Sequence, residues 1–202
     1  MDFKKLFYSE ETAKSATLIV DALNKSKRGE GILEKLRVKN RTLKETAKDK
    51  SYRIINYWTK TGLLDAREKG DLTWRKYSII DAAFLHIICE LRDLGIPTKE
   101  IERAKNVLYS AFPSNKNKLQ ITILEFLFAR VATEKNFGNL YLTFDKDSNY
   151  TFFSSADIKK TKLVELLPSA SVIINLNRLL KHYFGGRFQE HTFKEDIDYA
   201  DN

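Results

Sequence analysis

Cysteine, proline and glycine are scarce in this chain of 202 residues, and each shortage excludes a class of structure. A single cysteine, Cys89, rules out a disulfide framework and a zinc site built on clustered cysteines. Three prolines and eight glycines argue against a loop-rich or collagen-like chain, so the long periodic stretches favour helices. No apolar run reaches the roughly 18 residues that a membrane helix needs. The N-terminal sequence turns charged again at Glu10, too soon for a signal peptide, so we expect a cytoplasmic protein that does not engage a membrane.

The charge of the chain is distributed unevenly, although its composition is that of an ordinary globular protein. Hydrophobic residues make up 43% and charged residues 31%, which suits one domain or two small ones with a normal core. Residues 25–76 hold 16 basic against 7 acidic side chains, whereas residues 111–202 hold 12 against 11. A basic block followed by a nearly neutral one is typical of a nucleic-acid-binding module joined to a second domain. A solvated lysine-rich surface would give the same counts, so charge alone leaves both interpretations open.

The N-terminal segment 1–40 predicts a helical extension without recognisable chemistry. Residues 9–27 have apolar side chains at helical spacing, and Ser9 is placed to cap the helix. We expect Gly29 and Gly31 to interrupt this pattern before a short further turn at 32–36. This extension is interpreted as a packing or dimer surface.

Two short helices joined by a tight turn are predicted from Thr42 onward. Thr42-Leu43-Lys44-Glu45 fits a capping box, which predicts a helix through Ala47. Ser51 is placed to cap the second helix, and Gly62 to end it in the left-handed conformation.

The second of these helices has two contrasting faces. We expect Ile54, Ile55 and Trp58 to share the face that packs in the core. The opposite face presents two cations, an amide and a phenol at i, i+3, i+4 and i+7, namely Arg53, Asn56, Tyr57 and Lys60. This pattern describes a helix-turn-helix, although an ordinary helical hairpin at the surface would also fit.

Residues 65–77 predict a two-stranded hairpin, or wing, around a turn at Gly70-Asp71. Arg67, Arg75 and Lys76 would place basic side chains at and beside its tip. Two further helices are predicted after the wing, over residues 78–95 and 99–108.

Three segments of this region share features with one known family. The first is Ser51-Tyr52-Arg53-Ile54-Ile55-Asn56-Tyr57-Trp58 with Gly62-Leu63-Leu64, the second is Trp74-Arg75-Lys76-Tyr77, and the third is Leu91-Arg92-Asp93-Leu94-Gly95. In this order they resemble the recognition helix, the aromatic-Arg-x-Tyr wing and the Leu-Arg-x-Leu-Gly stretch of the mercury-resistance regulator (MerR) family. These are winged helix-turn-helix transcription factors, and the resemblance covers about residues 41–108.

The resemblance implies a recognition helix in the major groove of DNA and a wing along the neighbouring backbone. It implies that Arg53 approaches bases and phosphate, that Tyr57 reaches the backbone, and that Arg75 is the cation of the wing. The helical wheel adds Asn56 as a reader of an adenine edge and Lys60 as a phosphate partner. Weaker candidates for DNA contacts are Lys50, Ser51, Tyr52, Arg67, Thr73 and Lys76. Trp58 and Trp74 are interpreted as core residues.

The family also implies partners. Its members are dimers that bind palindromic promoters and deform an overlong spacer so that RNA polymerase engages both promoter elements. Double-stranded DNA, a second copy of this chain and RNA polymerase are therefore the expected partners, and the expected location is the nucleoid within the cytoplasm. A simple repressor could use the same module.

Residues 113–202 predict a small α+β domain for dimerisation or effector binding. After a linker at 112–117 we expect a helix over 119–131, a β-hairpin formed by 140–144 and 150–153, and a helix from Pro168 to about Phe184. The region after residue 110 holds 14 of the 24 aromatic residues. An aromatic core or dimer interface explains this enrichment best, and a pocket for a small apolar effector is the alternative.

No catalytic or metal-binding pattern competes with this interpretation. His86 and Cys89 lie at i, i+3, but two ligands do not make a closed metal site. The chain lacks a phosphate loop, a nucleophile elbow and a His-x-x-x-His pair, so no enzyme, cofactor or metal is predicted. The prediction is a mainly α protein with a helical extension at 1–40, a winged helix-turn-helix domain at 41–112 and a C-terminal domain at 113–202. The alternative is a protein-interaction or structural module that keeps this fold without binding DNA.

Overall fold

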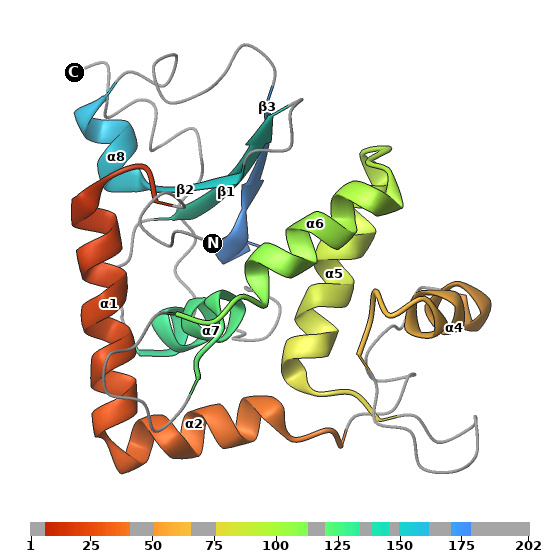
Figure 1. Ribbon diagram of the computed structural model, residues 1–202, viewed down its shortest axis with the longest axis horizontal. Helices are drawn as coiled ribbons and strands as arrows, with labels where there is room; N and C mark the ends of the chain where they lie inside the picture. The colour runs from red at the N-terminus through yellow and green to blue at the C-terminus, as the bar shows by residue number, and fades with distance from the viewer. Residues whose placement is uncertain are drawn as a thin grey trace. The chain divides into compact units, whose positions relative to one another are not determined.

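The fold is mainly helical, as predicted, with a small antiparallel sheet in the second half of the chain (Figure 1). The computed structural model describes residues 7–40, 51–65, 76–112, 120–133, 139–145, 150–161 and 171–178. In these ranges no helix is both long enough and apolar enough to cross a membrane. The predicted helix at 42–47 and most of the predicted wing lie outside the described residues.

The chain divides into two compact units. One, here called the sheet unit, combines Met1–Ser26 with Tyr109–Asn202, and the other, the helical unit, is Lys27–Leu108. The division differs from the boundaries expected after residues 40 and 112, because the first helix packs with residues that follow the helical unit in the sequence.

The helical unit is built around a long buried helix. Helix α5 (Ile79–Asp93) packs against α2 (Lys27–Arg37) and α6 (Thr98–Leu108), while α4 (Tyr52–Lys60) is the predicted second helix of the helix-turn-helix. Most of the side chains of α5 are buried, which explains its nearly continuous apolar sequence.

The ends of α5 form as the sequence predicts. The Ser78 Oγ accepts a hydrogen bond from the Asp81 N–H at 3.0 Å, and the Asp81 carboxylate accepts one from the Ser78 N–H at 2.7 Å, a complete capping box. Lys39 Nζ lies 3.6 Å from the same carboxylate and balances its buried charge. Gly95 follows the helix with a φ of +81°, a conformation that other residues rarely adopt.

The sheet unit contains three antiparallel strands in the order β2-β1-β3. Strands β1 (Leu140–Asp145) and β2 (Tyr150–Ser154) form the predicted hairpin. The helix predicted from Pro168 onward is wrong over β3 (Ser171–Asn175), which pairs with β1. The run Val172-Ile173-Ile174 is β-branched throughout, and such side chains favour a strand when a sheet edge is available to pair with.

The helices of the sheet unit include α1 (Glu10–Lys25), which packs against α7 (Ile123–Thr133), and the short α8 (Ser155–Lys160). Ser9 caps α1 as predicted, since its Oγ accepts a hydrogen bond from the Thr12 N–H at 3.2 Å. The predicted interruption at the glycines is wrong, because α1 ends before Ser26 and α2 runs through Gly29 and Gly31.

An aromatic cluster joins distant parts of the sheet unit. The Phe7 ring lies 5.6 Å from that of Phe152 and 6.3 Å from that of Phe112, and Phe112 lies 5.1 Å from Phe126, measured between ring centroids. Phe112 is 5% exposed and therefore belongs to the core, so the linker predicted to start there is wrong at this residue.

A buried carboxylate ties α1 to the start of α8. The Asp157 Oδ2 accepts hydrogen bonds from the Ser154 N–H at 2.7 Å, the Ser154 hydroxyl at 2.9 Å and the Thr12 hydroxyl at 2.8 Å. Three donors thus satisfy the carboxylate of a residue that is only 4% exposed. The Thr12 bond spans 145 residues and makes the N-terminal helix part of this unit.

We expect Thr12→Val to lower the free energy of unfolding of the full chain by about 1 kcal/mol, because a buried carboxylate loses one of its donors. Urea denaturation followed by circular dichroism measures this change. Thr17→Val is the matched control, since Thr17 is exposed and its hydroxyl donates to the Ala13 carbonyl of the same helix. Equal stability of the Thr12 and Thr17 variants would contradict the role given to this contact.

Candidate nucleic-acid interface

Helix α4 buries one narrow face and leaves the remainder in solvent. Ile55 is 0% exposed and Trp58 is 6% exposed, so Trp58 is a core residue as predicted. Ile54 was expected on the same face but is 44% exposed. The helix has only nine residues, and its contact with the core is limited to the strip around Ile55 and Trp58, which leaves Ile54 beside the outer face.

The predicted polar face of α4 is exposed in the structure. Arg53, Tyr57 and Lys60 are exposed, and Asn56 is half-buried. Tyr52 and Ser51 at the start of the helix are exposed too. The structure therefore brings six of the predicted DNA-contacting residues onto one short helix and its N-cap.

The electrostatics of this face are positive. The first turn of α4 contains no acidic residue, and its last turn contains Lys60. Among the residues that the structure describes, neither Arg53 nor Lys60 forms an ion pair. The positive end of the helix dipole adds to this field, so the surface attracts anions.

The start of α4 differs slightly from the expectation. Ser51 occupies the N-cap position, but its side chain makes no capping hydrogen bond. Its carbonyl instead accepts from the N–H groups of Ile54 at 3.0 Å and Ile55 at 3.3 Å. The Ser51 hydroxyl is thus not used by its own helix, which suits its predicted role as a contact to a ligand.

The end of α4 is fixed by two contacts that the sequence did not reveal. Lys105 of α6 donates from Nζ to the Gly62 carbonyl at 2.7 Å and to the Asp65 carboxylate at 3.0 Å. The Thr59 hydroxyl lies 3.3 Å from the hydroxyl of Tyr77, whose side chain is 1% exposed. Because Lys105 lies 43 residues beyond Gly62, local sequence patterns give no signal for this contact.

The chain reverses direction after α4 through the predicted glycine. Gly62 has a φ of +76°, and the Leu64 N–H donates to the Trp58 carbonyl at 3.0 Å. This turn sends Leu63 and Leu64, each 1% exposed, into the core. The burial of both leucines anchors α4 from its C-terminal side.

Of the five other predicted DNA-contacting residues, the structure describes only one. Lys76 is described and half-buried, next to the buried Tyr77. The remaining four candidates, Lys50, Arg67, Thr73 and Arg75, lie outside the described residues.

No competing metal site is found in the described part of the chain. It contains no group of three or more His, Cys, Asp or Glu side chains placed to hold a metal ion. His86 and Cys89 are both half-buried on α5.

Comparison with known protein families identifies the domain that contains α4. Residues 49–106 match the family model described as MerR HTH family regulatory protein. The chain contains a MerR-family helix-turn-helix domain. The match confirms the predicted family, covers α4, α5 and most of α6, and points to DNA-binding regulation rather than catalysis.

The MerR match spans less than a third of the chain. No curated protein matches the chain, and neither does any solved structure.

We expect Lys105→Met to loosen the C-terminal end of α4 within the MerR domain, because the Gly62 carbonyl and the Asp65 carboxylate lose their donor. Hydrogen exchange of the backbone amides of Thr61, Gly62 and Leu64 should accelerate about five-fold, as a loss of about 1 kcal/mol implies. Lys99→Met is the control, since Lys99 is an exposed lysine on the same helix α6. Unchanged exchange at these three amides would show that Lys105 does not hold α4.

Proposed function

We propose that this protein is a sequence-specific regulator of transcription that binds double-stranded DNA through α4. The observation that carries the proposal is the exposure of Arg53, Tyr57 and Lys60 on a helix whose opposite side is buried, inside the MerR match. A helix with one anchored face and one cationic face is what the major groove accommodates.

The side chains of α4 divide into two roles in this proposal. Arg53 and Asn56 read base edges, because guanidinium groups pair with guanine and side-chain amides with adenine. Tyr57, Lys60, Ser51 and Tyr52 contact phosphates, which position the helix without reading sequence.

The wing extends the same interface. Residues 65–77, with Arg67, Thr73, Arg75 and Lys76, lie along the DNA backbone next to α4 in this proposal, and Lys50 contributes from the turn before the helix. Support comes from the fixed base of this segment, where buried Tyr77 meets Thr59 of α4.

The proposal includes a homodimer on a palindromic site. One α4 covers only a few base pairs, and two copies related by two-fold symmetry would double the contacts and specify half-site spacing. Action on RNA polymerase through deformation of the promoter belongs to the same proposal.

A second function is supported by one observation. Tyr52 is 53% exposed, Ile54 44% and Tyr57 57%, so three large apolar or aromatic groups lie in solvent on α4. Tyrosine is enriched at protein interfaces, and a protein-interaction module on this fold would use such a surface. The two functions differ in their dependence on phosphate contacts.

Binding to random duplex DNA should weaken steeply as salt rises, because each phosphate contact releases counterions. Between roughly 50 and 200 mM salt we expect the affinity to fall about ten-fold or more. Fluorescence anisotropy of a labelled duplex with the full chain measures this. Absence of binding at the lowest salt would favour the protein-interaction module.

Arg53→Ala should weaken binding and broaden the sequence preference, since a base-reading guanidinium is lost; the expected cost is about 1–3 kcal/mol at a preferred site. Lys76→Ala should weaken all sequences alike. Arg103→Ala is the control, because Arg103 is an α6 cation bound to Glu100 at 2.7 Å. Selection from a random DNA pool reports preference and half-site symmetry, and an Arg53 variant that selects the parental sequences with parental affinity would refute the groove assignment.

A further inference from the structure

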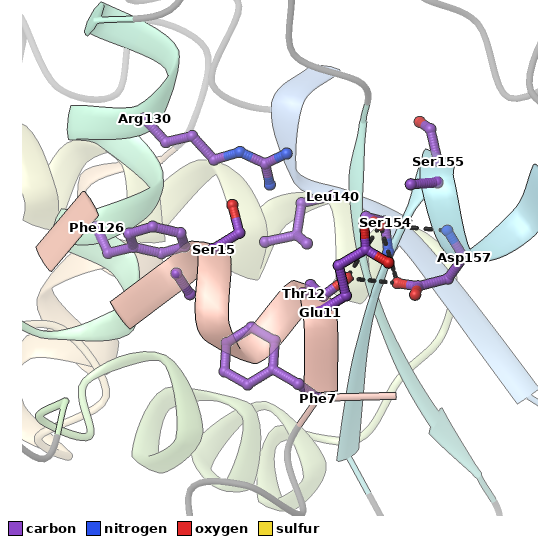
Figure 2. Close-up of a pocket in the computed structure, with 12 residues that line it drawn as sticks. Phe7, Glu11, Thr12, Ser15, Phe126, Arg130, Leu140, Ser154, Ser155 and Asp157 are labelled. Carbon is purple, nitrogen blue, oxygen red and sulfur yellow. Dashed lines mark hydrogen bonds between the residues drawn. The ribbon is translucent and has the colours of Figure 1, made fainter. Parts of the chain in front are cut away.

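The sheet unit contains a cavity of about 210 Å³ that neither the MerR match nor DNA binding explains. It lies among α1, α7, β1 and the start of α8 (Figure 2). Ser15 and Glu11 at its edge are exposed, so the cavity opens to solvent on the side of α1. This pocket is built by the described residues of one unit.

One part of the cavity wall is apolar and aromatic. Phe7, Phe126 and Leu140 line it and are 5%, 2% and 1% exposed. Ala16 of α1 also contributes, and its small side chain leaves the space open. An engineered apolar cavity of about 150 Å³ holds benzene, so this volume admits a single aromatic ring with a short substituent.

Arg130 adds a buried cation to this wall. The residue is 7% exposed, and Figure 2 shows its side chain extending from α7 toward Ser15 and Leu140. A guanidinium remains charged at any physiological pH, and its planar donors match the two oxygens of a carboxylate. Arg130 has other interactions inside the protein, but its Nε is buried and has no hydrogen-bond partner among the described residues.

The two acidic groups that line the cavity are already engaged by other parts of the protein. The buried Asp157 carboxylate accepts the three hydrogen bonds that join α1 to α8. Glu11 is paired with Lys160 at the surface, and the hydrogen bond and charge of Glu11 raise the pKa of Lys160 above its ordinary value. Arg130 is the one cation among the residues that line the described cavity.

We propose that this cavity binds a small aromatic carboxylate, with the carboxylate on Arg130 and the ring between Phe7, Phe126 and Leu140. Among the hydroxyl groups that line the cavity, those of Thr12, Ser154 and Ser155 donate within the protein, so Ser15 is the hydroxyl that we assign to the ligand. The site is more specific than the pocket for a small apolar effector that the aromatic content gave as an alternative to an aromatic core. It lies in the sheet unit and does not depend on whether α4 binds DNA.

Isothermal titration of the full chain with phenylacetate tests the proposal, with phenylacetamide as the uncharged analogue of the same shape. We expect saturable one-to-one binding of phenylacetate and at least about ten-fold weaker binding of the amide, since only the acid can pair with a guanidinium. Absence of phenylacetate binding at millimolar concentration, or equal binding of acid and amide, would overturn the proposal. Acetate and inorganic phosphate should bind more weakly than phenylacetate, because they leave the apolar wall uncovered.

Two variants locate the site. Arg130→Met should weaken phenylacetate binding about ten-fold or more, while Arg178→Met, which removes an exposed cation from the same unit, should leave it unchanged. Ser15→Phe fills the open side of the cavity without altering a charge and should abolish binding, which keeps the test decisive if Arg130→Met fails to fold. Parental affinity in a folded Ser15→Phe variant would show that phenylacetate binds elsewhere.

Discussion

The burial of the α4 side chains Ile55 and Trp58 is the interaction on which the functional interpretation depends. These two side chains and the following Leu63 and Leu64 fix one side of a nine-residue helix, which is too short to be stable alone. Because the anchored strip is narrow, the rest of the helix surface stays in solvent and carries Arg53, Tyr57 and Lys60. Packing in the core thus determines which side chains are available to a ligand.

Two polar contacts also hold the C-terminal end of α4 in place. Lys105 donates to the Gly62 carbonyl just after α4, and Tyr77, the last residue of the predicted wing, contacts Thr59 of α4. Each contact contributes about 1 kcal/mol or less, yet both act on the orientation of α4, and orientation decides whether a base-reading side chain reaches its partner. In the helical unit, α5 therefore supplies most of the buried core, whereas α4 and its contacts with Lys105 and Tyr77 determine how the DNA-contacting side chains are oriented.

Helix caps, glycine positions and hydrophobic spacing predicted much of the fold. They failed where contacts between segments distant in the sequence determine the structure. Ser9, Ser78 and Gly95 mark helix ends in the structure because caps and left-handed glycines act within a few residues. The spacing of apolar residues after Pro168 predicts a helix, but residues 171–175 form a strand, because pairing with β1 is not visible in their own sequence. Gly29 and Gly31 predict a break in the helix, but tertiary packing of α2 overrides their low helix propensity.

The candidate sites could likewise be predicted only where residues close in the sequence form them. The cationic face of α4 could be predicted because i, i+3, i+4 spacing defines a helix face by itself. The hydrogen bonds of Lys105 and the cavity at Arg130 could not be predicted, because each brings together residues that are far apart in the sequence. Thr12 and Asp157, which both line the cavity, are 145 residues apart. An isolated Arg130 in an apolar stretch gives no indication that Phe7 and Leu140 lie opposite it.

The most direct test of the central claim is photocrosslinking from α4 to DNA. A benzophenone amino acid placed at Tyr57 of the full chain should form covalent adducts with a bound duplex, with crosslinks to the two strands that map to one groove. The same group at Leu94, which is 66% exposed in the helical unit but distant in sequence from α4, should form few. If the chain binds DNA while the group at Tyr57 crosslinks only to protein, α4 is not the DNA-binding surface.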